Sequence, residues 1–356
     1  ALKLEHPLRV EVAERPPRVV RLGGAYASDE GATVSAAWIH RNLFGRAEQL
    51  TLTGEVGRLT QNRRSDLTHL AQGTLRVPDL WLRDLDLRLD LASVGERLDA
   101  YDRDAVTAGI ALERRFAAGL SGSVGLGFED AEVTQEAEPQ DYRLVFLPLT
   151  LSYDSTDEPL DPTRGLRLAV AASPAHVLEG EGSGFVRGRI LASGYWKPPV
   201  EAWQGQGGLP SAAAPDVAEE GGDALTLLQT VVAARLALGA IAGAGVDEVP
   251  PDWRFYAGGG GSVRGFPFQS IGPRTASNRP AGGDGLLEAS IEVRQRFGPH
   301  WGAVAFIDAG AVAEEGIPGI GDLAVGAGLG LRYHTPIGPV RFDVATPLTA
   351  SSGDSP

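Results

Sequence analysis

Cysteine is absent from the 356 residues of the sequence, which excludes disulfide frameworks, thiolate metal sites and cysteine nucleophiles. Methionine is absent too, even at position 1, and no signal-peptide pattern opens the chain, so we expect a processed or trimmed piece of a longer product. Lysine occurs only at Lys3 and Lys197, and the formal net charge is -14. Because nucleic-acid binding requires a basic face opposite the phosphates, the charge predicts no nucleic-acid partner.

Long hydrophobic runs are also missing. No apolar run reaches the roughly 18 residues that a membrane helix needs, and the best candidate, Val231 to Val246, is interrupted by Arg235. If the chain crosses a membrane, it must therefore do so with strands. Glycine is frequent, with 47 residues, and the 43% of hydrophobic residues are mostly dispersed among polar ones. This composition is typical of many strands and turns and favours an all-β fold.

Strict alternation of apolar and polar residues is the dominant pattern. From 84 to 92, leucine occupies every second position and charged residues occupy most positions between. A period of two is typical of a strand with one apolar face, and it recurs in 287–294, 323–332 and 340–345. The apolar face meets either a second sheet in a soluble sandwich or lipid around a membrane barrel. Its repetition in strand after strand favours the barrel.

Turn signals divide the chain into about fifteen strand candidates, each about as long as a tilted membrane strand. They begin near Val19, Thr33, Gln49, Leu67, Asp84, Ala105, Leu120, Tyr142, Gly165, Phe185, Leu225, Gly285, Trp301, Asp322 and Gly338. Two connections are long. The first, Lys197 to Ala224, is rich in Pro, Gly, Ala and acidic residues and indicates a flexible insertion. The second, Ala242 to Asp284, contains glycines, aromatics and arginines, and a loop of that length is expected to be functional or disordered.

The first residues follow a different pattern. Leu8 to Val12 alternates weakly and is followed by Glu14, Arg15, Pro16, Pro17 and Arg18. Two adjacent prolines end a strand and stiffen a linker. We therefore expect 1–18 to be the end of a preceding domain and its linker, and 19–356 to form the barrel.

Three segments together resemble a known family. Phe255 to Phe266, with Val263, Arg264, Gly265 and Phe266, resembles the sixth extracellular loop of the POTRA-barrel superfamily of outer-membrane proteins, which includes the Bam and Tam assembly barrels and two-partner-secretion transporters. The turn from Asp154 to Gly165 resembles the periplasmic turn before the ninth strand of that family, and its motif is Asp161, Pro162, Thr163, Arg164 and Gly165. Leu331 to Leu348 resembles the penultimate hairpin, and the entry segment Val10 to Arg18 resembles the TamA branch in particular.

The resemblance implies an all-β, 16-stranded transmembrane antiparallel barrel in the bacterial outer membrane. It implies a non-enzymatic assembly or translocation factor that inserts or exports β-rich clients such as autotransporters through a lateral seam. The implied partners are the lipid bilayer, unfolded client proteins and an inner-membrane-anchored TamB-like protein, and no cofactor or metal is implied. The chain departs from the family at its end, because Thr349 to Pro356 is small, polar and acidic where a last strand is expected. Since single-chain bacterial barrels have an even number of strands, we expect the sixteenth to be truncated.

The resemblance also implies that the loop arginine, Arg264, folds into the lumen and pairs with the acids Asp308 and Glu292. Alternation places both acids on polar faces independently of the family. A guanidinium can form two parallel bonds to a carboxylate and pin a flexible loop. We expect Gly265 to allow a sharp turn and Phe266 to pack against the lumen wall. In the alternative interpretation, Arg264 is a charge at a loop tip and the two acids only line a wet lumen.

Other functions remain as alternatives. A two-partner-secretion pore would export one dedicated substrate through the lumen, and a passive porin would not need Arg264 in its motif. An outer-membrane enzyme would need a Ser–His pair on neighbouring strand ends, and the sequence shows none; the six histidines are scattered without metal-ligand spacing. Gly326, Gly328 and Gly330 precede no helix pattern, so they indicate lumen space and not a phosphate site.

Overall fold

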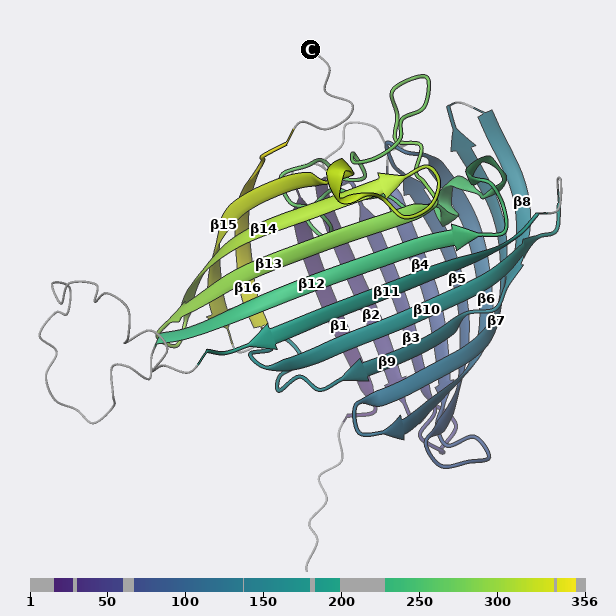
Figure 1. Ribbon diagram of the computed structural model, residues 1–356. Coiled ribbons are helices and arrows are strands. Elements are labelled where there is room, and N and C mark those ends of the chain that lie inside the picture. Colours follow the sequence, from purple (N-terminus) through teal and green to yellow (C-terminus); the bar gives the residue numbers. More distant parts are fainter. Residues whose placement is uncertain are drawn as a thin grey trace, which may run out of the picture.

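The structure is a computed structural model that describes residues 16–27, 31–59, 67–136, 138–179, 183–198, 228–335 and 338–349. Its described strands form a single antiparallel sheet that is rolled into a barrel (Figure 1). Among these residues no helix is long and apolar enough to span a membrane. Residues 1–15 of the expected linker, most of the expected insertion and residues 350–356 lie outside the described residues.

Sixteen strands follow one another around the barrel in sequence order, and all but β8 and β9 pair with the strands next to them in the sequence or across that pair. They are β1 (Arg18–Ala27), β2 (Gly31–Arg41), β3 (Gln49–Gly57), β4 (Thr68–Val77), β5 (Leu85–Arg97), β6 (Asp102–Ala117), β7 (Leu120–Gln135), β8 (Glu138–Phe146), β9 (Leu149–Asp154), β10 (Gly165–Val177), β11 (Gly184–Trp196), β12 (Leu228–Ala242), β13 (Gly285–Phe297), β14 (Trp301–Ala313), β15 (Ala324–Thr335) and β16 (Gly338–Pro347).

The fifteen strands expected from the sequence correspond to fifteen positions in the sheet, and one position holds two strand segments. β8 and β9 lie one after the other in the same place in the sheet, because both pair with β7 on one side and with β10 on the other. Leu147 and Pro148 separate them. Proline has no backbone N–H for the ladder, so it interrupts a strand without moving it out of the sheet. The sixteen segments therefore occupy fifteen positions around the barrel.

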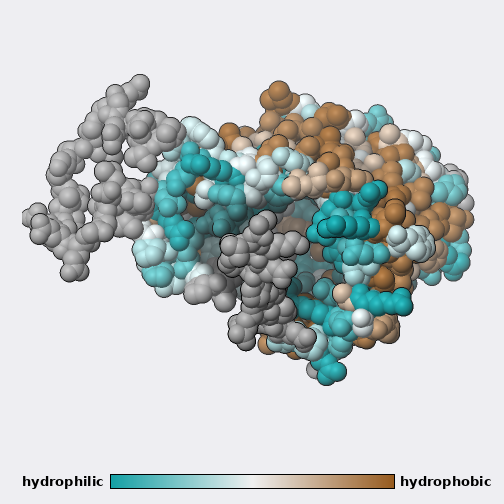
Figure 2. All heavy atoms as spheres, turned by 90° about the horizontal axis from the view of Figure 1, so that it is seen from below, coloured by the Kyte–Doolittle hydropathy of each residue, from teal (hydrophilic) through white to brown (hydrophobic). Residues whose placement is uncertain are grey.

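The alternation predicted from the sequence determines which residues face outward. Leu22 and Leu91 are 81% and 61% exposed. Many other apolar residues at the outward-facing positions of their strands are exposed too. Seen from below (Figure 2), hydrophobic residues gather on the outer wall and hydrophilic residues surround a hollow. On the inner face of β4, β5 and β6, Arg76 and Arg88 pair with Asp86, Asp90 and Glu113. The barrel, with an apolar outside and a charged inside, is confirmed against the sandwich alternative.

The two end strands each have one neighbour. β1 pairs with β2 and β16 pairs with β15, and no pairing joins β1 to β16 among the described residues. This edge, between β1 and β16, is called the seam below. Whether a further strand closes it in the whole protein stays a prediction.

The barrel has two rims, named by their position in Figure 1. The lower rim is the end at which β1 begins, and the upper rim carries residues 243–284, the connection between β12 and β13, called the lid loop below. The lid loop contains the 3-10 turns η4 (Val246–Glu248) and η5 (Pro251–Trp253), and a third, η6 (Ile320–Asp322), precedes β15. Apolar side chains of the lid loop form a buried cluster with inward residues of the wall, including Tyr101, Leu144, Phe185, Leu286, Val312, Val249, Phe255, Val263, Phe266 and Ile271. The core of this protein is therefore the lid loop inside the barrel.

Candidate functional site

The guanidinium of Arg264 is bound inside the barrel. Its Nε and Nη2 donate to the two oxygens of Asp308 at 2.6 and 2.9 Å, and its backbone N–H donates to the same carboxylate at 3.1 Å. Nη2 also lies 2.8 Å from Glu292, and the guanidinium carbon lies 3.4 Å from the ring centroid of Phe306. The side chain of Asp308 is 1% exposed. A bidentate pair sheltered from water by an aromatic ring holds the loop at a defined height.

A third carboxylate joins Arg264 to the seam. Nη1 of Arg264 lies 3.5 Å from Asp343 on β16, and Asp343 also pairs with Arg332 on β15. Together, Arg264, Asp308, Glu292 and Asp343 are called the motif anchor. It connects the lid loop to β14, β13 and β16, so the position of the lid loop and the position of the seam strand depend on each other.

The backbone around Arg264 fits only because two neighbours are glycines. Gly265 has a φ of +99°, and a Cβ there would lie 2.8 Å from the backbone carbon of Thr346 on β16. A Cβ on Gly326 of β15 would collide with the carbonyl oxygen of Arg264. The three glycines that were expected from the sequence to clear lumen space differ in their surroundings. Gly326 makes room for the lid loop, while Gly328 and Gly330 face Phe306 and Asp343. Phe266 is 7% exposed.

A second set of contacts holds the base of the lid loop. The carboxylate of Asp252 is 2.9 Å from Nε of Arg103 on β6 and accepts the hydroxyl of Tyr142 on β8. Arg103 also pairs with Glu129 on β7 at 2.9 Å, and Trp253 donates its indole N–H to Glu129. Asp252, Arg103, Glu129 and Tyr142 are called the base anchor. The side chains of Asp252 and Glu129 are 3% and 5% exposed.

The base anchor holds two buried carboxylates against one arginine. Burial raises the pKa of Asp252 to about 7, although the neighbouring Arg103 acts to lower it. Glu129 adds to the rise, because two carboxylates that share one cation repel each other. The surroundings of this lid-loop carboxyl therefore favour its protonated form.

Aromatic and backbone contacts complete the lid loop. The ring of Trp253 packs edge-on against Phe146 and Phe185, with centroids 5.1 and 5.6 Å apart. Arg187 on β11 stacks over Phe255 at 4.4 Å. Arg235 on β12 donates to the carbonyls of residues 261 and 262, each at 2.8 Å.

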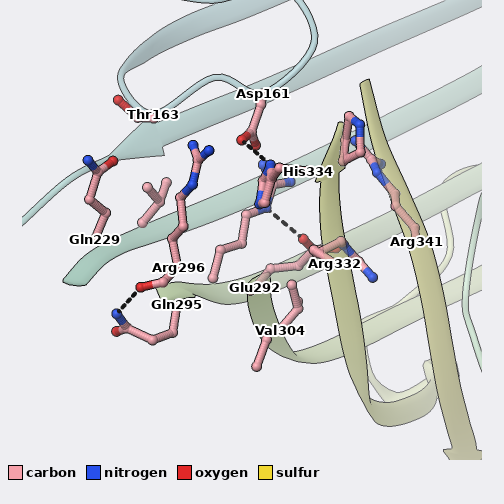
Figure 3. Close-up of a pocket in the computed structure, with 15 residues that line it drawn as sticks. Asp161, Thr163, Gln229, Glu292, Gln295, Arg296, Val304, Arg332, His334 and Arg341 are labelled. Carbon is pink, nitrogen blue, oxygen red and sulfur yellow. Dashed lines mark hydrogen bonds and ion pairs between the residues drawn. The ribbon is translucent and has the colours of Figure 1, made fainter. Parts of the chain in front are cut away.

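The turn motif lies at the lower rim, between β9 and β10. The hydroxyl and backbone N–H of Thr163 and the backbone N–H of Arg164 donate to Asp157, and the hydroxyl of Thr163 is the main reason that the pKa of Asp157 is well below its usual range. Gly165 has a φ of +104°. Asp161 points across the mouth and lies 3.5 Å from Nδ1 of His334 on β15 (Figure 3). The turn is thus braced internally and touches the far wall.

The structure brings Arg264 together with both acids named from the sequence, and it holds the turn motif at the opposite rim. Their role as a functional site stays a prediction. Sequence reasoning missed Asp343, His334 and the base anchor. The sequence did indicate that Asp343 faces the lumen, since it alternates with apolar residues in the same way as Arg341. No local pattern indicated the contacts of Asp252, because its partners lie 110 to 149 residues earlier in the chain.

Comparison with known proteins identifies the family. The model of the Omp85 superfamily domain matches residues 42–356. The chain belongs to the Omp85 superfamily. This match confirms the resemblance to the superfamily that was inferred from the sequence. The protein is an outer-membrane β-barrel, as was also expected. Assignment to the TamA branch stays a prediction.

Several solved structures share the fold. BamA from Haemophilus ducreyi lacking POTRA domains 1–3 aligns with a TM-score of 0.72 at 20% identity, covering 96% of this chain and 68% of that one. CdiB from Acinetobacter baumannii aligns with a TM-score of 0.59 at 14% identity, covering 94% of this chain and 56% of that one. CdiB from Escherichia coli aligns with a TM-score of 0.57 at 14% identity, covering 95% and 60%.

A curated relative matches over a shorter segment. The outer membrane protein assembly factor BamA of Nitratidesulfovibrio vulgaris is 34% identical over 115 residues, which is 31% of this chain and 14% of the relative. The matched segment thus spans a small part of that protein's length. The activity and partners of the whole relative reach this Omp85 chain only as proposals.

Proposed function

We propose that this barrel is a non-enzymatic assembly factor that inserts β-rich clients, such as autotransporters, into the outer membrane through the seam between β1 and β16. The observation that carries the proposal is the motif anchor, which joins the lid loop to β16 through Asp343 at 3.5 Å from Arg264. A lid loop that only plugged a pore would have no need of contact with an edge strand. The similarity to BamA supports the same class of activity.

The seam supplies the chemistry that insertion needs. β1 and β16 each present one edge without a partner among the described residues, and such an edge can pair with an incoming strand. Gly23 and Gly24 lie in the middle of β1, where the missing side chains weaken packing. We propose that, in the whole protein, the lower rim faces the periplasm, that β1 and a last strand pair weakly, and that a TamB-like protein and the upstream domains deliver clients there.

The alternative function is export of a dedicated substrate through the lumen, which the resemblance of the loop and turn motifs to two-partner-secretion transporters also allows. In that case the lid loop must leave the barrel during transport. The buried cluster, the motif anchor and the base anchor all oppose such a movement. The geometry therefore favours insertion at the seam.

Two disulfide locks separate these functions, and the chain suits them because it has no cysteine of its own. The first lock joins β1 to the closing strand in the full-length protein. The second joins the lid loop to the wall through Val263→Cys and Gly310→Cys, since a Cβ on Gly310 would lie 2.6 Å from the side chain of Val263. A lock across β5 and β6, Ser93→Cys with Val106→Cys, is the control, because these residues are partners in the sheet.

The measurement is insertion of an autotransporter client in cells that depend on the protein, with and without reductant. We expect the seam lock to block insertion reversibly, while the lid lock and the control lock leave it unchanged. Block by the lid lock alone would assign the protein to lumen export and overturn the proposal.

A further inference from the structure

A cavity at the lower rim is lined by arginines and a histidine from three strands. It lies under the turn 155–164, and its walls include Arg296 of β13, Arg332 and His334 of β15, and Arg341 of β16 (Figure 3). All four residues have the inward parity of their strands. The residues of opposite parity are exposed on the outside, namely Ile291 and Val293 on β13, Leu329 and Leu331 on β15, and Val340, Phe342 and Val344 on β16. The cavity is therefore part of the lumen.

Glu292 and Asp343, two acids near this cavity, are already paired with other arginines, among which is the wall residue Arg332. Glu292 binds Arg264 at 2.8 Å and Arg294 at 3.0 Å, and Asp343 pairs with Arg332. Within the described residues, neither Arg296 nor Arg341 has a carboxylate oxygen within the 4.0 Å of an ion pair. Two guanidinium groups thus face the same enclosed space without an anionic partner, an arrangement that favours an anion between them.

One carboxylate already reaches into the cavity from outside its walls. Asp161 lies 3.5 Å from His334 and points toward it in Figure 3. It is carried by a turn that comes from the opposite part of the barrel and is braced by the hydrogen bonds to Asp157. The side chain of Asp161 remains 37% exposed, so it fills the cavity only in part.

We propose that the cavity formed by Arg296, Arg332, His334 and Arg341 is a binding site for the side-chain carboxylates of an acidic peptide segment, and that Asp161 occupies it until such a segment displaces the turn. The inference rests on the proposed function, since it gives an incoming client a first point of contact beside β16. The bound occupant in the structure is itself a carboxylate on a peptide turn, which is why a peptide is favoured over other anions.

A lipid headgroup fits the geometry less well. Its phosphate would have to enter the lumen, because the outward side chains of β16 are apolar: Val340, Phe342 and Val344 are 61%, 66% and 61% exposed. An acidic peptide that enters through the lower rim reaches the arginines directly. Arginine binds carboxylates and phosphates alike in a bidentate way, so access to the lumen and not guanidinium chemistry favours the peptide.

The test uses the full chain in nanodiscs of phosphatidylcholine and a short peptide of alternating glutamate and serine that carries a neutral fluorophore. Fluorescence anisotropy measures its dissociation constant for the unaltered protein, for Asp161→Asn, and for Asp161→Asn combined with Arg296→Gln and Arg341→Gln. A peptide with glutamine at the glutamate positions is the ligand control. Arg115→Gln is the protein control, because Arg115 pairs with Asp84 near the same rim on the opposite wall.

We expect Asp161→Asn to tighten peptide binding by about tenfold, the change that corresponds to one lost competing charge contact, and the two arginine substitutions to reverse the gain. Arg115→Gln should leave the dissociation constant unchanged, and the glutamine peptide should not bind. Equal or weaker binding by Asp161→Asn overturns the proposal. Binding that is absent for the peptide but appears for phosphatidylglycerol vesicles, with the same arginine dependence, also overturns it and assigns the site to a lipid headgroup.

Failure of this site is distinguishable from failure of the proposed function. Client insertion in the disulfide-lock experiment depends on the seam and not on Arg296 or Arg341. If the seam lock blocks insertion while no variant changes peptide binding, only the binding site is refuted. If the seam lock has no effect, the proposed function falls, whatever the peptide does.

Discussion

The motif anchor and the base anchor hold the same loop by different electrostatics. In the motif anchor, Arg264 is surrounded by three carboxylates, and two of these have a second arginine, Arg294 or Arg332. In the base anchor, two carboxylates that are at most 5% exposed share Arg103, and the pKa of Asp252 rises to about 7. The first anchor has three arginines for three carboxylates, whereas the second has one arginine for two carboxylates. We infer that the tip of the lid loop is held firmly and that its base is adjustable.

The largest expected effect comes from Arg264→Ala. It leaves Asp308, with a side chain 1% exposed, without its cation, and loss of one partner of a buried pair costs about 3–5 kcal/mol. We expect faster hydrogen exchange in 255–266 and loss of client insertion, while the barrel stays in the membrane. Arg115→Ala is the matched control, since its exposed pair with Asp84 contributes less than about 1 kcal/mol. Unchanged exchange in 255–266 would contradict the role of the anchor.

Arg103→Gln tests the claim that a single arginine serves both buried carboxylates of the base anchor. The change leaves Asp252 and Glu129 with no arginine, so we expect protection of 246–256 to fall by up to about 3 kcal/mol at pH 8. The loss should be smaller at pH 5, because a protonated Asp252 needs no cation. Hydrogen exchange of 246–256 at both pH values, corrected for intrinsic rates, gives the answer. An equal loss at both would show that Arg103 acts through packing alone.

The pH response of the unaltered protein separates the two anchors. The pKa of Asp252 is about 7 in the folded state and 3.8 in its ordinary state, so the folded state binds the proton more tightly. Its contribution to stability is therefore fully present below about pH 4 and is lost as pH rises through 7. We expect protection of 246–256 to decrease from pH 5 to pH 8 and to become independent of pH in Asp252→Asn. A decrease that persists in Asp252→Asn would assign the titration to another group.

The smallest expected effect is that of Tyr142→Phe. It removes one hydroxyl donated to Asp252 and leaves the aromatic ring in place. A single hydrogen bond to a charged group contributes about 1.5–3 kcal/mol, and here Arg103 remains as a second partner, so we expect the lower end. The readout is protection of 246–256 at pH 8, with Tyr256→Phe as a control at another lid-loop hydroxyl. A loss as large as that of Arg103→Gln would mean that the hydroxyl, and not the cation, holds Asp252.

Which residues of the barrel wall face outward or inward could largely be predicted from the local alternation of apolar and polar residues. Leu85 to Leu91 alternate with charged residues, and a strand can place its side chains on only two faces, so the outward and inward sets were predictable. The same parity placed Glu292 and Asp308 inside. The break at Leu147 and Pro148 was missed, because a proline inside an alternating run ends a hydrogen-bonded segment without ending the run. Strand ends also shifted, as for β8, which begins at Glu138 and not near Tyr142.

The sequence by itself determined the all-β barrel, its apolar outside, the placement of Arg264 near Asp308 and Glu292 through a family motif, and the turn motif. Only the tertiary structure decided that Asp252 meets Arg103 and Glu129, that Asp343 links the lid loop to the seam, and that Asp161 crosses the lower rim to His334. The reason is physical. Alternation reports which face a residue takes along one strand, but contacts across a closed barrel depend on curvature and on where a long loop folds back, and neither leaves a local pattern.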